Sequence, residues 1–329
     1  MPPWNVYVTR RLPEPGMSMM AQRCRLDVNP HDRPVTRAEL LNAVRGRDGI
    51  VTLLTETIDA EVMDAAGPQL RVISNYAVGY NNIDVAEATR RRILVCNTPG
   101  VLTETTADLA WALLMAVARR IVEADAFMRA GKYAAMGGWS PTLLLGTDVH
   151  GKTLGIVGFG RIGEALARRA RGFDMRILYH DVRRRPADEE RRLGVEYSAL
   201  DELLKESDFV SVHVDLNEST RHLINERTLG LMKATGYLIN TSRGPVVDEA
   251  ALVRALKERR IAGAGLDVFE HEPEMAPGLA ELPNVVVLPH IASASTETRA
   301  KMAEMAASNL IAALEGRRPA HVVNPEILG

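Results

Sequence analysis

The segment GIVGFGRIGEALARRA, residues 155–170, limits the possible folds of this chain more than any other stretch. An apolar strand pattern runs directly into a helical pattern, and Gly158, Gly160 and Gly163 stand at the turn between them. The first glycine of such a turn permits a tight bend, the second lets a pyrophosphate approach the backbone, and the third lets helix and strand pack closely. Amides at the helix start then bind phosphate. We therefore predict a dinucleotide site formed by these glycines and the residues between them, Phe159, Arg161 and Ile162.

The identity of the dinucleotide depends on the residues that follow the next strand pattern. Asp181 ends MRILYHD, eighteen residues after Gly163, where an acid is expected to bind the ribose hydroxyls. An acid there repels a 2′-phosphate and favours NAD, whereas the arginines that follow, Arg183 first among them, would attract that phosphate and favour NADP. The alternative for this basic run is a solvated turn and helix face. We predict NAD as the favoured cofactor and keep NADP open.

Strand and helix patterns alternate on both sides of this turn. Strands are expected at 5–9, 23–29, 49–54, 72–78 and 93–98, and then at 153–158, 175–181, 208–214, 236–242, 263–268 and 284–290. Helical patterns lie between them, and a last helix at 296–315 is free to return to the first domain. Such alternation, with near-continuous apolar strands, is typical of parallel sheets covered on both faces. The expected fold class is α/β, with two doubly wound parallel-sheet domains.

Length and composition exclude several other classes of protein. A chain of 329 residues is long enough for two domains, and its formal net charge of −2 gives no basic field for nucleic acid. The longest apolar run, residues 109–118, is about half of the roughly 20 residues that a membrane span needs. Two separated cysteines, Cys24 and Cys96, form no disulfide framework, and no signal peptide is visible, so we expect a cytoplasmic protein. No metal site is predicted.

Several further stretches resemble one enzyme family. NYAVGYNNIDV, NTPGVLTETTAD, GKTLGIVGFGRIG, LINTSRGPVVDEAAL, AGLDVFEHEP and LPHIASAS occur in order over roughly residues 45–325. Together they resemble the D-isomer-specific 2-hydroxyacid dehydrogenases, most closely the glyoxylate and hydroxypyruvate reductase branch. The resemblance implies a Rossmann cofactor domain, residues 101–290, inserted into a flavodoxin-like substrate domain made of residues 1–100 and 291–329. It also implies an active cleft between the domains and a homodimer.

The resemblance places the catalytic groups on three residues. Arg243, in NTSRG, would bind the substrate carboxylate through its planar fork and polarise the adjacent carbonyl. His290, in LPHIASAS, would donate a proton to the carbonyl oxygen during reduction and accept it during oxidation. Glu272, in FEHEP, would hydrogen-bond His290 and favour its protonated form. Glu270 is the rival for that role.

Four residues are expected around the substrate. Val78 and Gly79 would offer backbone amides to its carboxylate, with a plain strand-to-loop turn as the alternative. Leu54 would form part of the wall of a small pocket. Trp139, in GWSP, resembles a tryptophan that reaches the active site of the neighbouring subunit in this branch. A tryptophan on a surface loop is the alternative.

Further residues are expected near the cofactor. Asp267, in GLDVF, would accept from the nicotinamide carboxamide, and Thr241 and Ser242 would line the site beside Arg243. Thr106 would lie at the interdomain hinge, unless it simply caps the long apolar helix, a role that we also considered for Thr103 and Thr105. One departure stands out, because Asp215 occupies a position where the family commonly has proline.

The leading hypothesis is therefore NAD(P)H-dependent reduction of glyoxylate or hydroxypyruvate to the D-2-hydroxy acid. Within the same class, a phosphoglycerate dehydrogenase without a regulatory domain is the alternative. Formate and phosphite dehydrogenases share the fold, but Glu272 weighs against a formate enzyme. From a different class, a non-enzymatic, NAD-sensing co-repressor would need peptide-binding and tail segments that the sequence does not show.

Overall fold

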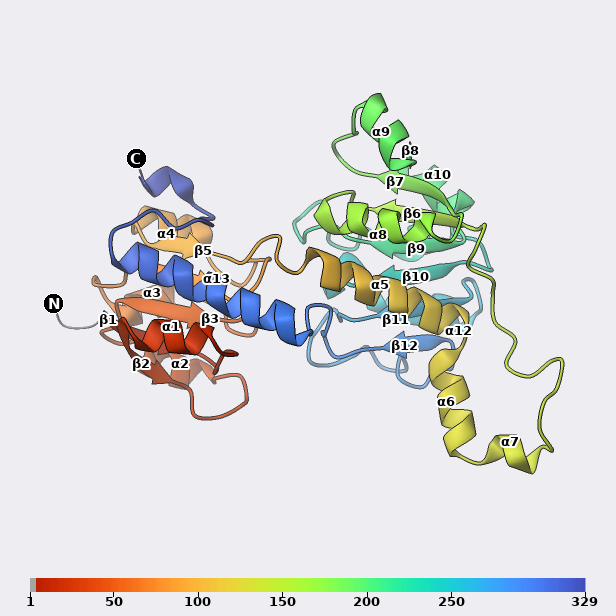
Figure 1. The fold of residues 1–329 in the computed structure, drawn as a ribbon, viewed down its shortest axis with the longest axis horizontal. Coiled ribbons are helices and arrows are strands. Elements are labelled where there is room, and N and C mark those ends of the chain that lie inside the picture. The colour runs from red at the N-terminus through yellow and green to blue at the C-terminus, as the bar shows by residue number, and fades with distance from the viewer. Residues whose placement is uncertain (1–3, 329) are drawn as a thin grey trace. The chain divides into compact units, whose positions relative to one another are not determined.

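The structure, a computed structural model that describes residues 4–328, divides the chain into two compact units (Figure 1). The first holds the described residues of Met1–Leu102 and Ser293–Gly329, and the second is Thr103–Ala292. Each unit has one sheet, of five and seven strands, in which all neighbouring strands run parallel. The predicted fold class, α/β with two parallel-sheet domains, is confirmed.

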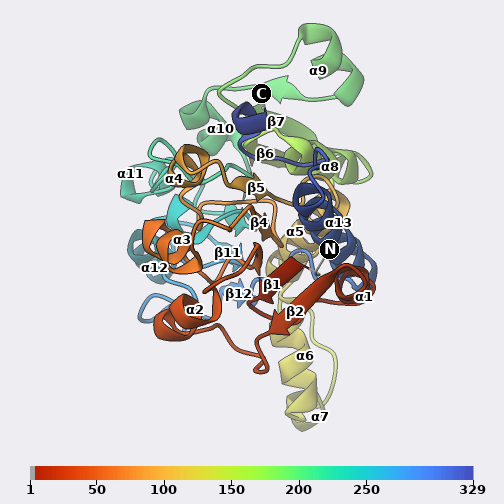
Figure 2. The ribbon, with the colours of Figure 1, turned by 90° about the vertical axis from the view of Figure 1, so that its left-hand side faces the viewer.

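The first unit is a three-layer α/β structure. Its strands follow the order β2-β1-β3-β4-β5, and their bounds are Trp4–Val8 (β1), Cys24–Val28 (β2), Gly49–Thr52 (β3), Val72–Asn75 (β4) and Leu94–Cys96 (β5). One face packs on α1 (Gly16–Ala21) and α13 (Thr296–Leu314), and the other on α2 (Arg37–Ala43), α3 (Ala60–Ala66) and α4 (Val85–Arg90) (Figure 2). Successive side chains of β1 point to opposite faces of the sheet, since Val6 and Val8 pack on the side of α1 and α13, whereas Tyr7 packs on the side of α2, α3 and α4.

The C-terminal helix α13 belongs to this first sheet. Ser295 caps it by accepting a hydrogen bond from the Thr298 amide at 3.1 Å. Its buried face is rich in alanine, which lets the helix approach the strands closely, and the Ser74 hydroxyl of β4 donates to the Ala306 carbonyl at 2.9 Å. The first sheet is therefore covered by a helix that lies after the whole second unit in the sequence.

The second unit carries the glycine-rich turn. Its strand order is β12-β11-β10-β9-β6-β7-β8, with bounds Thr153–Val157 (β6), Arg176–His180 (β7), Glu196–Tyr197 (β8), Phe209–Val212 (β9), Tyr237–Asn240 (β10), Gly263–Leu266 (β11) and Val285–Val287 (β12). One face packs on α5 (Thr103–Ala118) and α8 (Arg161–Arg171), and the other on α10 (Leu200–Glu206), α11 (Glu226–Leu229) and α12 (Glu249–Lys257). The strand order reverses between β6 and β9, where open α/β sheets bind ligands.

Some helices were not expected from the sequence. Besides α1 and α4, they include α9 (Ala187–Leu193) and an arm of two helices, α6 (Ile121–Arg129) and α7 (Lys132–Ala135), which has no buried residue and projects from the second unit (Figure 1). Because α5 already begins at Thr103, Thr105 lies inside this helix and is not its N-cap. Among residues 4–328, no helix combines the length and the apolar character needed to cross a membrane.

Candidate active site

Three neighbouring strands of the second unit bring the predicted catalytic residues to one edge of its sheet. β12, β11 and β10 lie side by side and run parallel. Arg243 follows β10, Glu272 lies in the loop after β11, and His290 follows β12. Because parallel neighbours end at the same edge, this topology gathers a guanidinium, a carboxylate and an imidazole at the carboxyl ends of the strands.

Glu272 and His290 form a hydrogen-bonded pair. One Glu272 oxygen lies 2.9 Å from His290 Nδ1, and the other accepts the Phe269 amide at 3.1 Å. Burial raises the pKa of Glu272, but His290, the Phe269 amide and the charge of Arg243 together hold that pKa below its usual range. A carboxylate can only accept, so Nδ1 carries the proton of this bond. His290 Nε2 bonds to no described residue, which leaves it available to a substrate.

The Asp267 carboxylate fixes the backbone next to His290 through hydrogen bonds. His290 has a φ of +55°, an uncommon conformation for a residue other than glycine. The Asp267 carboxylate is fully buried and accepts the next two amides, Ile291 at 2.8 Å and Ala292 at 2.7 Å. Burial raises the pKa of Asp267, while these amides and His290 lower it. Asp267 thus fixes the turn that carries the imidazole, and its contact with nicotinamide stays a prediction.

Arg243 interacts electrostatically with two carboxylates, those of Asp215 and Glu272. Burial lowers the pKa of its guanidinium, and the charges of Asp215 and Glu272 act in the opposite direction. Its Nη1 donates to the Ser242 carbonyl at 2.7 Å. The Asn240 side chain, almost fully buried at the end of β10, shapes the turn by donating to the Arg243 carbonyl at 3.0 Å. Asp215 is therefore an electrostatic neighbour of the proposed substrate-binding arginine, a relation that its sequence position did not indicate.

Gly244 brings the Arg243 segment into backbone contact with the Glu272 loop. A Cβ at Gly244 would lie 1.8 Å from the Phe269 carbonyl oxygen and 2.5 Å from the Glu270 nitrogen. No side chain fits in that space. The two segments that carry the guanidinium and the carboxylate therefore pack at a distance that only glycine permits.

Glu270, the rival of Glu272, has partners of its own. It accepts from His222 Nε2 at 2.5 Å and from the Glu249 amide at 3.2 Å. Glu249, which is buried, accepts in return from the amides of Glu270 at 2.8 Å and Ala276 at 3.0 Å. These reciprocal bonds tie the start of α12 to the loop that carries Glu272, so Glu270 braces this loop and does not touch His290.

The glycine-rich turn has the three features that phosphate binding requires: a tight bend, close packing of the helix on the strand, and open space beside the backbone. Gly158 has a φ of +94°, and its added Cβ would meet the His213 carbonyl carbon at 2.6 Å. At Gly163 an added Cβ would lie 2.4 Å from the Gly158 oxygen, so helix α8 packs tightly on β6, whereas nothing lies within 4 Å of a Cβ on Gly160. His213, which hydrogen-bonds Ser211 at 2.8 Å, has its pKa lowered to about 4 by burial and is neutral beside the turn.

Asp181 lies directly against this turn. One of its oxygens accepts the Phe159 amide at 2.7 Å, and the other accepts the Arg183 amide at 3.0 Å. The Phe159 ring is buried against Tyr179, with ring centroids 4.4 Å apart, so only the backbone of Phe159 is left for a cofactor. Arg161 is exposed and Ile162 half-buried at the start of α8.

The arginines after Asp181 are not equivalent. Arg184 pairs with Glu190, at 2.9 Å and 3.0 Å. Arg185 lies 3.6 Å from Glu164 and 3.4 Å from Glu189. The Arg183 side chain is exposed and makes no ion pair or hydrogen bond within residues 4–328. Of the three, Arg183 is therefore the one available to a 2′-phosphate.

Residues that follow β10 or lie on α5 were also predicted near a bound dinucleotide. Thr241 is buried after β10, and its hydroxyl has no hydrogen-bond partner in the described part of the chain. Such an orphaned group is costly unless a ligand satisfies it. Ser242 is half-buried and donates to the Asn240 carboxamide oxygen at 2.8 Å, and Thr106 is buried in the first turn of α5. The open glycine turn and the Thr241 hydroxyl support the fit; a role for Ser242 and Thr106 stays a prediction.

The predicted substrate residues of the first unit follow two neighbouring strands. Leu54 follows β3, while Val78 and Gly79 follow β4, and all three are half-buried. Trp139 belongs to the second unit and is 79% exposed. No described residues form a cluster able to hold a metal ion.

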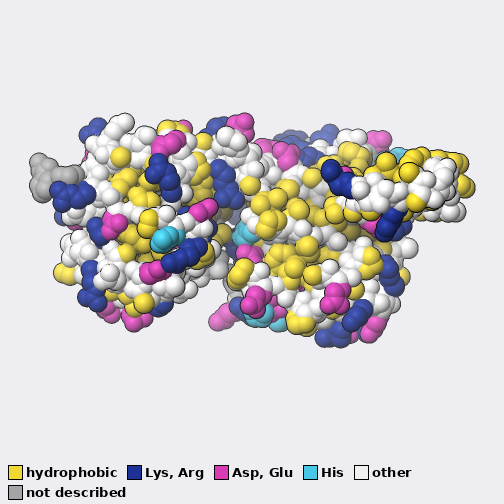
Figure 3. All heavy atoms as spheres, turned by 90° about the horizontal axis from the view of Figure 1, so that it is seen from below, with side chains coloured by type: hydrophobic (Ala, Val, Ile, Leu, Met, Phe, Trp, Pro, Cys, Tyr) yellow, Lys and Arg dark blue, Asp and Glu magenta, His cyan; other side chains and the backbone are white. Residues whose placement is uncertain are grey.

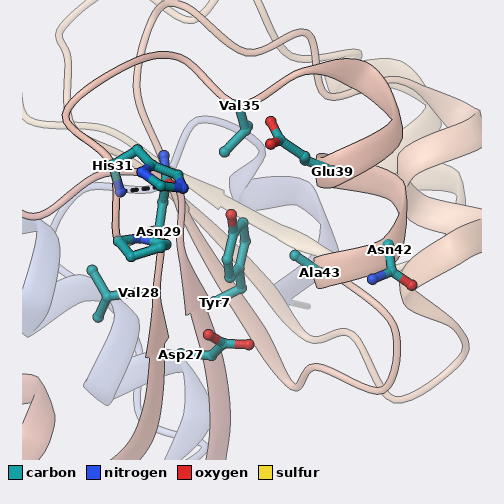
Figure 4. Close-up of a pocket in the computed structure, with 10 residues that line it drawn as sticks. Tyr7, Asp27, Val28, Asn29, His31, Val35, Glu39, Asn42 and Ala43 are labelled. Atoms are coloured by element: carbon teal, nitrogen blue, oxygen red, sulfur yellow. Dashed lines mark hydrogen bonds between the residues drawn. The ribbon is translucent and has the colours of Figure 1, made fainter.

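A separate pocket of about 270 Å³ lies in the first unit, beside the ends of β1 and β2 (Figure 4). Tyr7, Asp27 and Glu39 point toward it, and the His31 amide bonds Asn29 at 3.1 Å at its edge. None of the residues predicted from the sequence as site residues lines this pocket. The chemistry of the candidate site therefore comes from its side chains and not from this cavity.

The sequence reading missed several residues that build the site. Asn240, Gly244, Glu249 and His222 were not predicted, although all four support the segments that carry the predicted catalytic residues. A signal existed for Asn240, because an asparagine ends an apolar strand there, and for Gly244, because a glycine follows Arg243 directly. No local pattern distinguishes Glu249 and His222, whose partners lie far along the chain.

Comparisons with known proteins agree on one family. Residues 111–292 match the family described as "D-isomer specific 2-hydroxyacid dehydrogenase, NAD binding domain". The glyoxylate reductase of Korarchaeum cryptofilum is 57% identical over 326 residues, covering 98% of this chain and 97% of that one. A glyoxylate reductase from Paecilomyes thermophila matches with a TM-score of 0.87 at 34% identity, covering 99% and 100%. An NADPH-dependent glyoxylate/hydroxypyruvate reductase from Sinorhizobium meliloti, solved with NADP and malonate, matches with a TM-score of 0.85 at 34% identity, covering 98% and 97%.

Proposed function

The chain belongs to the D-isomer-specific 2-hydroxyacid dehydrogenase family, and we propose on this premise that it reduces glyoxylate and hydroxypyruvate to glycolate and D-glycerate. As a member of the family it is an NAD(P)-dependent oxidoreductase. Relatives named glyoxylate reductase support the substrate class. The observation that carries the proposal is the Glu272–His290 pair at the same sheet edge as Arg243.

We propose that Arg243 binds the substrate carboxylate. Arg243 is half-buried, and in such partly desolvated surroundings a charge-assisted, bidentate bond to a carboxylate is stronger than in water. The same group polarises the neighbouring carbonyl and so makes its carbon a better hydride acceptor. Val78 and Gly79 are proposed to contribute uncharged backbone amides to the carboxylate.

His290 is proposed as the proton donor. The reduced nicotinamide, when bound, supplies the hydride that adds to the carbonyl carbon. As negative charge develops on the carbonyl oxygen, the free Nε2–H of protonated His290 gives its proton to that oxygen and forms the hydroxyl group. Glu272 holds the ring by Nδ1 and stabilises the imidazolium before transfer. In the oxidation of a hydroxy acid, neutral His290 takes the proton back.

NADH is proposed as the preferred cofactor because Asp181 lies against the glycine-rich turn, where a 2′-phosphate would meet its charge. The second unit is proposed as the cofactor domain and the first as the substrate domain. Both cysteines are buried free thiols, which supports a reducing cytoplasmic location.

A homodimer is proposed from the arm of the second unit. Six large apolar side chains on and after α6 and α7 are exposed: Ile121, Val122, Met128, Met136, Trp139 and Leu145. Figure 3 shows hydrophobic surface at the end of this arm. Exposed apolar side chains gathered on one segment support an interface with another protein chain. We propose that Trp139 reaches the partner's active site. Light scattering should give twice the chain mass of 36.1 kDa, and a monomer would contradict the proposal.

The test of the proposed reaction is a panel of 2-keto acids crossed with NADH and NADPH, read as kcat/KM from loss of reduced-cofactor absorbance. Glyoxylate and hydroxypyruvate should rank highest, with 3-phosphohydroxypyruvate as the informative competitor. Arg243→Ala should lose nearly all turnover while it still binds NADH. Arg227→Ala, which removes an exposed arginine of the same unit, is the matched control and should behave like the wild type. Wild-type rates from Arg243→Ala would remove this arginine from the mechanism.

A further inference from the structure

Three consecutive backbone amides after β4 have no hydrogen-bond partner among the described residues. The N–H groups of Val78, Gly79 and Tyr80 donate no hydrogen bond to any residue between 4 and 328. They follow the carboxyl end of a parallel strand, where ligands bind in sheets of this type. Val78 and Gly79 are half-buried, whereas Tyr80 is exposed. Because half-buried backbone amides are normally paired, the open amides of Val78 and Gly79 require an explanation.

The carbonyls that precede these amides are each held in place. The Ala77 carbonyl accepts the Thr98 amide at 2.8 Å, the Val78 carbonyl accepts Asn97 Nδ2 at 2.7 Å, and the Gly79 carbonyl accepts Asn75 Nδ2 at 2.8 Å. A trans peptide is planar, and its C=O and N–H point in opposite directions. Fixing these three carbonyls therefore fixes the directions of the three open amides, and each amide points away from the donor that holds its peptide.

The two asparagines come from the ends of neighbouring strands. Asn75 ends β4 and is fully buried, and Asn97 directly follows β5. The Asn75 side-chain oxygen has no hydrogen-bond partner in the described part of the chain, an unfavourable state for a buried acceptor. This side chain therefore serves the fold through its donor group, which holds the Gly79 carbonyl.

Asn75 also connects this loop to the one that carries Leu54. Its Nδ2 lies 3.3 Å from the Asn82 side-chain oxygen, and Asn82 in turn donates to the carbonyls of Leu53 at 2.9 Å and Glu56 at 3.1 Å. The loops after β3 and β4 are thus held as one piece. Open amides in a preset arrangement bind an anion without a charge of their own.

We propose that Asn75 and Asn97 are positioning residues that set the amides of Val78, Gly79 and Tyr80 as a neutral receptor for the substrate carboxylate. The inference rests on the proposed function, because it names how this loop holds the 2-keto acid. It adds the Tyr80 amide as a third donor and gives both asparagines an effect on substrate binding and none on cofactor binding.

The experiment compares Asn97→Ala with Asn324→Ala. Asn324 is a matched control, because its buried side chain bonds Ile93 and Val95 at the other end of β5. Asn97→Ala should raise the KM for glyoxylate about tenfold, as expected when the geometry of a bond to a charged group is lost. Its kcat and NADH affinity should stay near the wild type. Asn97→Asp, which turns an oxygen toward the Val78 carbonyl, should raise KM further. Asn324→Ala should lower the melting temperature without changing KM.

A second measurement uses the wild-type protein and does not depend on turnover or on the folding of a variant. Oxalate, an unreactive dicarboxylate, is titrated into the NADH complex while backbone amide resonances are recorded. The resonances of residues 78–80 should shift together, and Asn97→Ala should bind oxalate more weakly. Oxalate binding without glyoxylate turnover would refute the proposed reaction and leave the receptor intact. Unmoved resonances at 78–80, an unchanged KM in folded Asn97→Ala, or an equal KM rise in Asn324→Ala would overturn the receptor.

Discussion

Gly244→Ala should inactivate the enzyme although the added methyl group touches no reacting atom. The new Cβ would lie 1.8 Å from the Phe269 carbonyl oxygen, whereas ordinary contact begins near 3.4 Å. The Arg243 segment and the Glu272 loop must therefore separate by roughly 1.5 Å, a distance set by van der Waals contact. Displacements of about 1 Å in catalytic groups cost about 100-fold in rate. At 1.36 kcal/mol per factor of ten, the expected loss is about 2.7 kcal/mol of transition-state stabilisation.

The assay is kcat/KM for glyoxylate with NADH, together with NADH affinity from fluorescence and the melting temperature. Binding of NADH should persist, because the glycine-rich turn lies after another strand, β6. Gly172→Ala is the control, since its Cβ would meet only the Arg169 carbonyl oxygen, at 3.4 Å, and it should retain wild-type kinetics. A folded Gly244→Ala enzyme with kcat/KM within threefold of the wild type would refute the argument that this backbone contact sets the spacing of guanidinium and carboxylate.

Three other outcomes follow from the electrostatics of the site. The pKa of Glu272 is held below its usual range, so its ionisation stabilises the fold above the unfolded value of about 4.3, and this stability is lost as pH falls through the folded value. Glu272→Gln should therefore lose less stability than the wild type on acidification below about pH 4.3, in denaturant titrations across pH, while losing reductase activity; parallel acid curves would contradict this. Burial lowers the pKa of His213 to about 4, so between about pH 6.5 and pH 4 this side chain is protonated in the unfolded chain and neutral in the folded protein. His213→Asn should flatten the decline of stability between about pH 6.5 and pH 4, as the linkage relation requires, and an unchanged slope would show that another group causes it. Asp181→Ala should raise the KM for NADH about tenfold, because a hydrogen bond to a charged group is lost. The difference in KM between NADH and NADPH should therefore become smaller, and an equal rise of KM for both cofactors would count against a role of Asp181 at the ribose.

Most strands of both sheets could be predicted because they are apolar runs and largely buried, whereas the two-residue strand β8 (Glu196–Tyr197), which has no buried residue, was not predicted. The 72–78 pattern contains β4 (Val72–Asn75), and the 284–290 pattern contains β12 (Val285–Val287). Each predicted run extends past the observed strand into the loop that carries site residues. Hydrophobicity alone does not mark where hydrogen bonding to the neighbouring strand ends, because these loops remain partly buried.

The short helices could not be predicted for a different reason. Helices α6 and α7 have no buried residue, so no apolar stripe distinguishes them from a loop. The start of the long helix α5 could not be predicted either, because a threonine can cap a helix or lie within it. The structure shows that α5 already includes Thr103.

The supporting residues of the site depend on contacts between distant parts of the chain. His222 meets Glu270 across 48 positions, and Ala276 meets Glu249 across 27. Such pairs exist only once the strands have been ordered in the sheet. The three proposed catalytic residues could be predicted because each follows a strand within a distinctive motif, whereas the residues that support them have no local sequence pattern.

The position of α13 in the chain has a consequence for synthesis of the protein. The apolar face formed by Val6, Val51 and Val72 is covered by a helix that begins at Thr296. During translation from the amino terminus, that face has no complete cover until the ribosome has added the whole intervening unit. The second unit can therefore fold before the first. Until α13 has been synthesised, the apolar valines of the first sheet stay exposed to solvent, and exposed apolar surface of this kind is what chaperones bind on growing chains.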